Sequence, residues 1–480
     1  MCCMAVAIAT VTALAGEKVE MKDKGIKIMV ISDPHLLAPA LHDDGAAARH
    51  LAESDMKLVL ESDMIMERMV DEIINEHAQL LLITGDLTFN GARASHERLV
   101  THLERLRQAG VRSLVIPGNH DVRCPYSKQY LGDSTEPVAT VSSEEFARLY
   151  SSCGYGDDAE RDPNSLSYTC EPIPGLMMLC IDSNRYSENR LPGDEGGIEY
   201  HNDGAIKPES MEWIKHQLAV AQSQGKRVIA LMHHHLLEHI DGESKLLPNY
   251  IVAGHEQVAQ VLRDGGVKVV FTGHLHITDA VTMSGLSDVA TGSASTYPLP
   301  MRTVTVSPAI DSLSIDTHFF SGIDSVLLNH GRCKVEKSVS SISSLIARRL
   351  WSKLSGRAEK LTQMLAMQGM EAKGMPHDAR ELSELLLRHL REPLTQSLLS
   401  VARGGEDPQQ AVAIINAIKQ GVRGMIVEII PDGGELMADF LLEELLPRVE
   451  PTLRSALEDL NRVGDTDESH TDDHRLVIGW

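Results

Sequence analysis

Five short apolar segments, each followed directly by polar or charged side chains, constrain the fold of this chain more than any other feature. They are rich in β-branched residues and span 27–32, 80–84, 113–116, 227–232 and 267–272. Such runs are typical of buried parallel strands. Helical patterns between them predict an α/β fold, in which the carboxyl ends of the strands share the edge where ligands bind.

Asp, Asn and His residues follow all five strands. In chain order the clusters are Asp33-Pro-His35, Gly85-Asp86, Gly118-Asn-His-Asp121, His233-His-His235 and Gly273-His-Leu-His276. Carboxylate, amide and imidazole ligands without cysteine suit zinc, iron, manganese or similar divalent ions. Seven candidate ligands exceed the four that satisfy a structural zinc. The number predicts two ions about 3.5–4 Å apart, sharing a carboxylate and a hydroxide, as in two-metal phosphoester hydrolases.

Each cluster taken alone has an ordinary structural explanation. A single His or Asp after a strand is usually a cap or a satisfied polar group, and Gly85-Asp86 or Gly118-Asn119 could simply form a turn. The joint occurrence of all five clusters, in one order and on strand ends, is what favours a metal centre over these explanations.

With these clusters in this order, residues 26–300 resemble the calcineurin-like metallophosphoesterase superfamily. The resemblance implies an α/β sandwich of two packed sheets flanked by helices, followed here by an all-α C-terminal domain. It also implies two metal sites and their ligands. The first ion would be held by Asp33, His35 and His276, the second by Asn119, His233 and His274, and both would be bridged by Asp86.

The same resemblance implies two catalytic residues beside these ligands. His120 matches the family's catalytic histidine, which meets the substrate and protonates or hydrogen-bonds the leaving oxygen. Asp121 is expected to orient that imidazole and to stabilise its charge.

The triple histidine at 233–235 leaves the identity of one ligand open. His233 directly follows the strand, which is the position that carries the ligand in the family. Side chains alternate along a strand, so His234 would point the other way and His235 would share the side of His233. Because His235 stands where the family often has proline, His234 or His235 remains an alternative ligand.

Charge narrows the class of partner. The 480 residues carry 45 Lys and Arg against 68 Asp and Glu, a formal net charge of −23. A sequence-independent grip on DNA or RNA needs a basic surface, so no nucleic acid polymer is expected as a partner. A small phosphoester remains a suitable substrate, because bound metals supply local positive charge.

An uncharged apolar run occupies residues 2–15 and ends in Ala13-Leu-Ala15. It suits the apolar region of a signal peptide over residues 1–16 and is too short to span a bilayer, so no stable transmembrane segment is predicted. Export to the periplasm, the cell surface or the medium is therefore expected. A short apolar helix or strand in a cytoplasmic protein is the alternative.

The pattern of apolar residues changes from strand-like runs to helical periodicity at about residue 335. Residues 17–335 carry the strand ends and form the expected metallophosphoesterase domain. From 336 to 463 helical periodicity predicts a bundle with helices at 340–368, 379–403, 408–428 and 434–462. Pro393 is expected to kink or split the second helix. Residues 464–480 are expected to form a polar tail.

Residues 85–121 narrow the resemblance further. The segment GDLTFNGARASHERLVTHLERL, followed by VIPGNHD, is similar to the corresponding segments of bacterial cyclic-nucleotide phosphodiesterase-like members of the superfamily. Protein phosphatases of the superfamily usually carry GD-x-VDRG and GNHE instead. The resemblance implies attack of a metal-bridging hydroxide on a small nucleotide-like or other diester, with Mn, Fe or Zn as the metals. The alternatives are a phosphomonoesterase, a protein phosphatase, or a metal-binding surface protein whose helical domain docks a partner.

Overall fold

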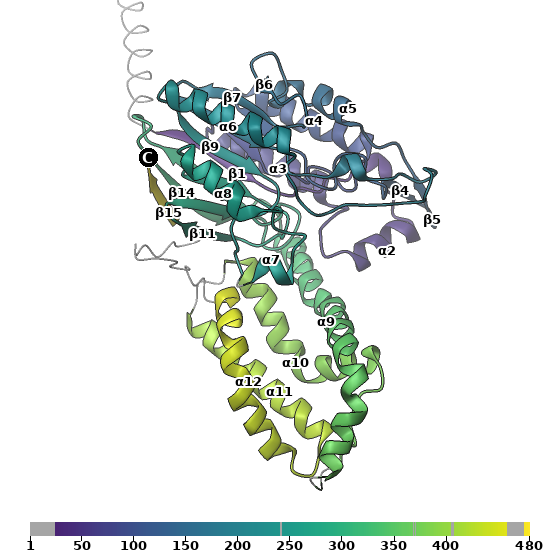
Figure 1. Cartoon of the computed structure of the whole chain (residues 1–480). Helices are drawn as coiled ribbons and strands as arrows, with labels where there is room; N and C mark the ends of the chain where they lie inside the picture. The colour runs from purple at the N-terminus through teal and green to yellow at the C-terminus, as the bar shows by residue number, and fades with distance from the viewer. Residues whose placement is uncertain (1–24, 241, 368, 370, 405–407, 458–474) are drawn as a thin grey trace, which may run out of the picture.

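A computed structural model describes residues 25–240, 242–367, 369, 371–404, 408–457 and 475–480. The predicted signal peptide at 1–16 lies outside these residues. Within the described ranges, no helix combines the length and the apolar character needed to cross a membrane. Figure 1 shows a sandwich of sheets and helices above a separate group of long helices.

The first sheet has six strands in the order β15-β14-β13-β1-β2-β3. Its members are β1 (Ile26–Ile31), β2 (Leu80–Ile83), β3 (Arg112–Val115), β13 (Pro300–Val306), β14 (Ser312–Phe319) and β15 (Arg475–Gly479). The first three run parallel, and the last three extend the sheet antiparallel from β1. This arrangement places the carboxyl ends of β1, β2 and β3 side by side.

Strand β15 departs from the polar tail predicted over 464–480. Residues 464–474 lie outside the described part of the chain, but Arg475–Gly479 pairs with β14. Leu476 and Ile478 alternate into the core and are buried, whereas Val477 between them is exposed. An apolar alternation of only five residues is short enough to be masked in the sequence by the acidic stretch before it.

The second sheet has seven strands in the order β11-β12-β10-β9-β8-β7-β6. Its members are β6 (Glu160–Arg161), β7 (Tyr168–Ile173), β8 (Leu176–Ile181), β9 (Arg227–Met232), β10 (Val269–Thr272), β11 (Asp279–Met283) and β12 (Leu286–Ala290). Its central strands β8, β9, β10 and β12 run parallel. Ile28 of the first sheet and Phe271 of the second belong to one buried core, so the two sheets pack face to face.

Helices flank the sandwich on its outer faces and at its edge. They are α2 (Ala46–Ser54), α3 (Ser62–Asn75), α4 (Arg93–Gln108), α5 (Ser143–Leu149), α6 (Pro208–Ser223), α7 (Glu243–Leu246) and α8 (His255–Asp264). Met69 and Leu103 of α3 and α4 join the core of the first sheet, and Leu218 and Leu262 of α6 and α8 pack with the second. A hairpin of β4 (Lys128–Leu131) and β5 (Ser134–Pro137) lies beside α2. The predicted two-sheet α/β sandwich is confirmed.

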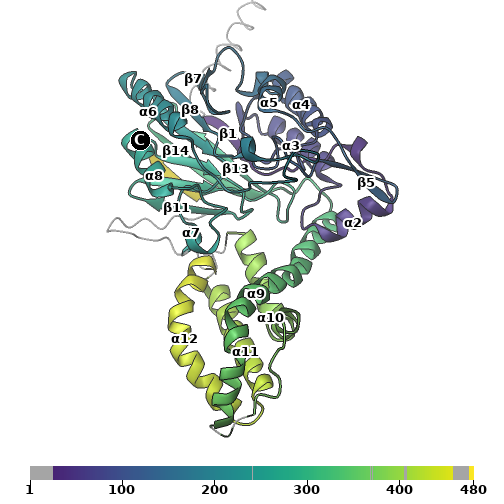
Figure 2. The same cartoon turned by 45° about the vertical axis from the view of Figure 1, so that its right-hand side comes forward.

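Four long helices form the C-terminal part, which confirms the predicted helical region. They are α9 (Ser325–Met367), α10 (Ala379–Ala402), α11 (Pro408–Ile429) and α12 (Gly434–Leu457). The helix α10 is not split at Pro393, because it continues through this buried proline, and the alternative of a kink there stays a prediction. The predicted domain boundary at residue 335 falls inside α9. Both views show α9 leaving the sandwich near α2 and running down the bundle (Figures 1 and 2).

Candidate metal centre and active-site pocket

All five polar clusters meet where strands of the two sheets end. Their backbone is unusual, because Asp33, His35, Asp86, His274 and His276 all have positive φ, between 41° and 69°. Side chains other than glycine rarely adopt this region, and residues held there concentrate at functional sites. The chain thus turns sharply after β1, β2 and β10 and directs several ligand side chains toward one point.

Gly118 and Gly273 are required by close packing in this turn-rich edge. A Cβ at Gly118 would collide with the backbone nitrogen and the carboxylate of Asp86. A Cβ at Gly273 would collide with the side chains of Ser32 and Asp33. Both glycines therefore let neighbouring strand ends approach each other closely enough for their ligands to converge.

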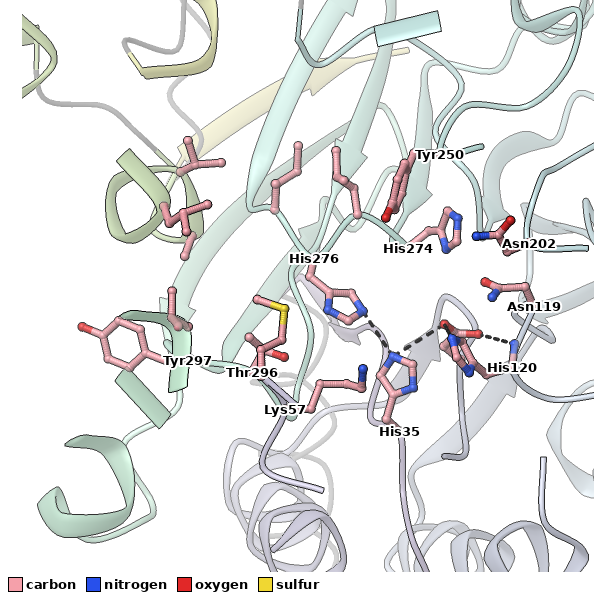
Figure 3. Close-up of a pocket in the computed structure, with 18 of the residues that line it drawn as sticks. His35, Lys57, Asn119, His120, Asn202, Tyr250, His274, His276, Thr296 and Tyr297 are labelled. Carbon is pink, nitrogen blue, oxygen red and sulfur yellow. Dashed lines mark hydrogen bonds and ion pairs between the residues drawn. The ribbon is translucent and has the colours of Figure 1, made fainter. Parts of the chain in front are cut away.

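The first ligand group consists of Asp33, His35, Asp86 and His276. His276 Nε2 lies 3.3 Å from Asp33 Oδ1 and 3.2 Å from His35 Nε2. His35 Nε2 is also 3.5 Å from Asp86 Oδ2. Figure 3 shows these rings turned toward one another. One carboxylate oxygen and two ring nitrogens thus surround the same point, and Asp86 closes the group from the second side.

The second ligand group consists of Asp86, His233 and His274. His233 Nε2 lies 3.5 Å from Asp86 Oδ1 and 3.1 Å from Asn119 Oδ1. Asp86 therefore offers Oδ2 to the first group and Oδ1 to the second, as a bridging carboxylate must. Every ligand assigned from the family resemblance lies in one of the two groups or, for Asn119, against the second.

In two of the ligand rings, the nitrogen that does not face the other ligands is hydrogen-bonded to a backbone carbonyl oxygen. His233 Nδ1 lies 2.8 Å from the carbonyl oxygen of Thr84, and His274 Nε2 lies 3.1 Å from that of Asn249. A carbonyl can only accept, so these ring nitrogens carry hydrogen. The opposite nitrogen of each ring is therefore the one that a metal ion would bind.

The donor set fits a pair of divalent cations. Asp33 Oδ1 is buried and accepts no hydrogen bond from the described residues, and the ring nitrogens of His35 and His276 are its polar neighbours. A buried carboxylate oxygen without a hydrogen bond is costly, and a cation would compensate it. Burial, followed by the charge of Lys57, lowers the pKa of His35 well below its usual value, so its ring is neutral and able to bind a metal. Burial also lowers the pKa of His274. Burial acts to lower the pKa of His233 as well, but the negative charge of Asp86 outweighs burial and raises this pKa to about 9. A bound cation would take the place of the positive charge on the ring.

His234 and His235 have other partners. His234 Nδ1 lies 2.8 Å from Ser183 Oγ, and His235 Nδ1 lies 2.7 Å from Glu243 Oε1. Of the three consecutive histidines, the structure places only His233 in a ligand group.

His120 stands beside the two groups without belonging to either. Its backbone nitrogen donates to Asp86 Oδ1 at 2.8 Å, and its Nδ1 donates to Asn90 Oδ1 at 2.7 Å. Its side chain is 25% exposed, and Nε2 lies 3.9 Å from Asp86 Oδ2. The imidazole is thus held at one nitrogen and faces the pocket with the rest of its ring.

The sequence predicts that Asp121 contacts this imidazole, but in the structure its carboxylate points elsewhere. Its buried carboxylate accepts from the backbone nitrogens of Leu87, Thr88 and Gly118 at 2.8–2.9 Å. The tight turn that brings Asp121 N to the Gly118 carbonyl oxygen directs the carboxylate back into the protein. Asp121 therefore joins the Gly118–Asp121 turn to the segment after β2, and Asn90 forms the hydrogen bond to the His120 ring that was expected of Asp121. The Asn90-Gly91 sequence, with positive φ at Asn90, has the ordinary appearance of a turn.

A cavity of about 300 Å³ opens over the two groups. Lys57, Tyr200 and Tyr250 line it beside the ligands, and none of them is evident from the sequence (Figure 3). Tyr200 accepts a hydrogen bond from Asn119 Nδ2, which turns Asn119 Oδ1 toward His233. The Tyr250 ring lies 4.8 Å from that of His274. These contacts orient the second group from the solvent side.

Comparison with known proteins places the chain in a family. The model of the calcineurin-like phosphoesterase family matches residues 26–278, more than half of the chain. The chain belongs to this family. The match spans the strand ends from β1 to the segment after β10, and so contains every ligand of the two groups.

Two curated relatives are each 26% identical to this chain. One is named a probable cyclic nucleotide phosphodiesterase of Rhodococcus erythropolis, matched over 219 residues, or 45% of this chain and 57% of the relative. The other is named a cAMP/cGMP dual specificity phosphodiesterase of Mycobacterium tuberculosis, matched over 221 residues, or 45% and 65%. The chain thus spans less than two thirds of either relative. Among solved structures, a dimetal phosphatase of Danio rerio aligns with 17% identity and a TM-score of 0.42, covering 63% of this chain and 98% of that one.

Proposed function

We propose that this protein is a metal-dependent phosphodiesterase acting on a small diester. The observation that carries the proposal is the position of Asp86, whose two oxygens face two separate groups of ligands while His120 stands free beside them. Two divalent ions held there would neutralise the phosphoryl oxygens and supply a nucleophile from water near neutral pH. The chain's own residues then have to bind the diester and serve the leaving group.

The leaving oxygen is the task of His120. In hydrolysis, the oxygen of water bonds to phosphorus, one ester P–O bond breaks, and the departing oxygen needs a proton. A ring protonated at Nε2 supplies that proton while Asn90 holds Nδ1. Burial lowers the pKa of His120, which makes the protonated ring a stronger acid, and the Asp86 carboxylate opposes this by favouring the charged ring.

Lys57 supports the choice of an anionic substrate. It lines the cavity beside His35 and is mostly buried, with an ion pair to Asp55 at 3.2 Å. A diester phosphate bound over the two groups would lie within the field of this ammonium group. The cavity is also the size of a small-molecule site. A large phosphoprotein is less suited to it, which ranks the protein-phosphatase alternative below a small diester.

A metal-supplemented substrate panel tests the proposal. Metal-stripped protein is loaded with Mn²⁺, Fe²⁺ or Zn²⁺ and assayed on bis(p-nitrophenyl) phosphate, cyclic nucleotides, glycerophosphodiesters, phosphomonoesters and phosphopeptides. Metal-dependent turnover of diesters above monoesters is expected. Turnover of phosphomonoesters alone would replace the proposal by a phosphatase. No turnover with any metal would favour a metal-binding protein that docks a partner.

A further inference from the structure

We propose that the helical domain supplies an apolar subsite next to the metal centre, and that the natural substrate carries an alkyl or acyl chain that fills it. This rests on the proposed phosphodiesterase function and names its substrate class. The observation behind it is that the cavity over the metal ligands extends to a wall made by helices outside the sandwich.

One end of the cavity is polar and the other is apolar. Figure 3 shows His120, Asn119 and His274 at one side and Thr296 and Tyr297 at the other, with His35, His276 and Lys57 between them. The side chains that make the cavity partly apolar are those of Met56, Leu275, Ile277, Tyr297, Val335, Leu398, Val401 and Ala402. Apart from histidines, the charged residues that line the cavity in the described part of the chain are Asp86, at the metal ligands, and Lys57, between the two sides. A ligand matching this cavity has an anionic head and an apolar tail.

Helix α10 presents its residues to the cavity in a regular pattern. Leu398, Val401 and Ala402 are spaced i, i+3 and i+4, so they lie on one face of its last turn. All three side chains are only partly buried, and all three line the cavity that leads to the metal ligands. Val335 of α9 is buried beside them and packs with Tyr297. The three α10 side chains therefore offer apolar surface that a substrate chain could still cover, and Val335 backs them.

Thr296 gives a second, independent sign of a ligand. Its side chain is 4% exposed and lines the cavity, yet Oγ1 has no hydrogen-bond partner among the described residues. A buried hydroxyl without a partner is costly. An ester or ether oxygen near the start of a substrate chain would accept its hydrogen, whereas a nucleobase would need several donors and acceptors that this wall does not offer.

The helical domain also holds the segment that carries Met56 and Lys57. Lys334 of α9 is 6% exposed, and its Nζ donates to the carbonyl oxygens of Ala52 and Asp55, the latter at 3.0 Å. Both acceptors lie just before Met56 in the chain. The wall is thus fixed to the sandwich on the α9 side, and the subsite is a built part of the site.

A chain-length series tests the subsite directly. The substrates are p-nitrophenyl alkyl phosphodiesters from methyl to hexyl, all of which release p-nitrophenolate when water adds to phosphorus and leave an alkyl phosphate. We expect kcat/KM to rise about fourfold per methylene until the chain fills the wall. Cyclic nucleotides are expected to be poorer substrates than the hexyl ester.

A filling variant and a matched control make the test specific. Ala402→Phe should lower kcat/KM for the hexyl ester about 15-fold more than for the methyl ester, which is the effect of two methylenes at about fourfold each. Ala413→Phe makes the same substitution at an exposed position of α11 and should change neither. If Ala402→Phe does not fold, calorimetry on the wild-type protein still compares binding of methylphosphonate with that of hexylphosphonate.

The outcomes separate this inference from the proposed function. Tighter binding of hexylphosphonate without turnover of any diester would support the subsite and refute the phosphodiesterase. Turnover that is flat across chain length, or an equal loss for both esters in Ala402→Phe, would refute the subsite and keep the phosphodiesterase. A clear preference for cyclic nucleotides over every alkyl ester would also overturn the proposed substrate class.

Discussion

Arg403 of the helical domain contacts Tyr297 of the sandwich through both its ring and its hydroxyl group. Its guanidinium carbon lies 5.5 Å from the centroid of the tyrosine ring, and its Nη2 donates a hydrogen bond to the phenol oxygen. Arg403 directly follows α10, while Tyr297 lines the cavity and is 5% exposed. The contact therefore ties the last turn of α10, with its cavity-facing residues, to the edge of the active site.

Arg403→Ala should loosen this wall without disturbing the metals. Loss of a cation–π contact and a hydrogen bond removes about 1–2 kcal/mol of docking energy. We expect KM for a long-chain diester to rise several-fold, with kcat for the methyl ester and the bound metal unchanged. Arg391→Ala on an exposed position of the same helix is the control. An equal loss of kcat on every substrate would assign Arg403 to overall stability instead.

Asp86→Asn should weaken both metal sites at once. The two oxygens of Asp86 face different ligand groups, so the change removes charge from both. Mutation of a residue that only hydrogen-bonds to a metal ligand typically costs about 10–100-fold in metal affinity. Loss of a carboxylate shared by both ions should cost more. Elemental analysis after dialysis gives the number of ions per chain, with exposed Asp44→Asn as control. Two retained ions together with normal turnover would rule out a shared carboxylate.

His120→Ala should keep both ions and lose rate by about 10²–10⁴-fold, because its proton serves the leaving group. The loss should be smaller for p-nitrophenyl esters than for alkyl esters, since p-nitrophenolate leaves with little protonation. Steady-state assays on the two ester types, with metal content measured in parallel, check this. Loss of metal, or the same factor for both ester types, would contradict the assignment.

Asn90→Asp should move the pH profile. A carboxylate in place of the amide that accepts the Nδ1 hydrogen of His120 would raise the pKa of the imidazole. Since the protonated ring is the active form, the basic limb of kcat/KM should shift to higher pH. The left-handed backbone at residue 90 accommodates Asp as it does Asn, so the fold should persist. An unchanged profile would show that Asn90 does not position His120.

Buried His96 should make the metal-free protein less stable in acid. Burial lowers the pKa of His96 to about 4, while its rings contact the Asp121 carbonyl oxygen and the Tyr150 hydroxyl at 2.9 Å. The unfolded state has the higher pKa, near 6.5, so it binds the proton first and stability falls as pH drops from 6.5 to 4. The expected loss is about 3 kcal/mol over that range. Urea unfolding in EDTA measures it, and His96→Gln should flatten the slope by about one proton. Parallel slopes in the two proteins would exclude this origin.

The metal ligands and the sandwich could be expected from the chain alone, because both depend on short-range pattern. An apolar run of strand length forms a buried strand, and the residue after it falls on the shared edge. Asp33 and Asp86 directly illustrate this, since each follows its strand within two or three residues. The place of His233 in the second group, directly after β9, follows from the same rule.

The partner of His120 depended on tertiary structure. Asp121 is adjacent in sequence, but its turn points the carboxylate inward, while Asn90 reaches the ring from 30 residues away. The direction of a side chain in a turn depends on backbone angles that the residue types there leave open. The local sequence therefore pointed to His120 and missed Asn90, the residue that hydrogen-bonds to its ring.

The apolar wall was decided by domain packing. Val335, Leu398 and Val401 occupy ordinary apolar positions of amphipathic helices, and in the sequence they are indistinguishable from bundle core. Whether such a side chain faces its own bundle or an active site depends on how the helices dock. That docking is set by contacts such as Arg403 with Tyr297 and Lys334 with Asp55, each between residues more than 100 positions apart. Sequence periodicity determines that a helix has an apolar face, and only the packing of the whole chain determines what that face meets.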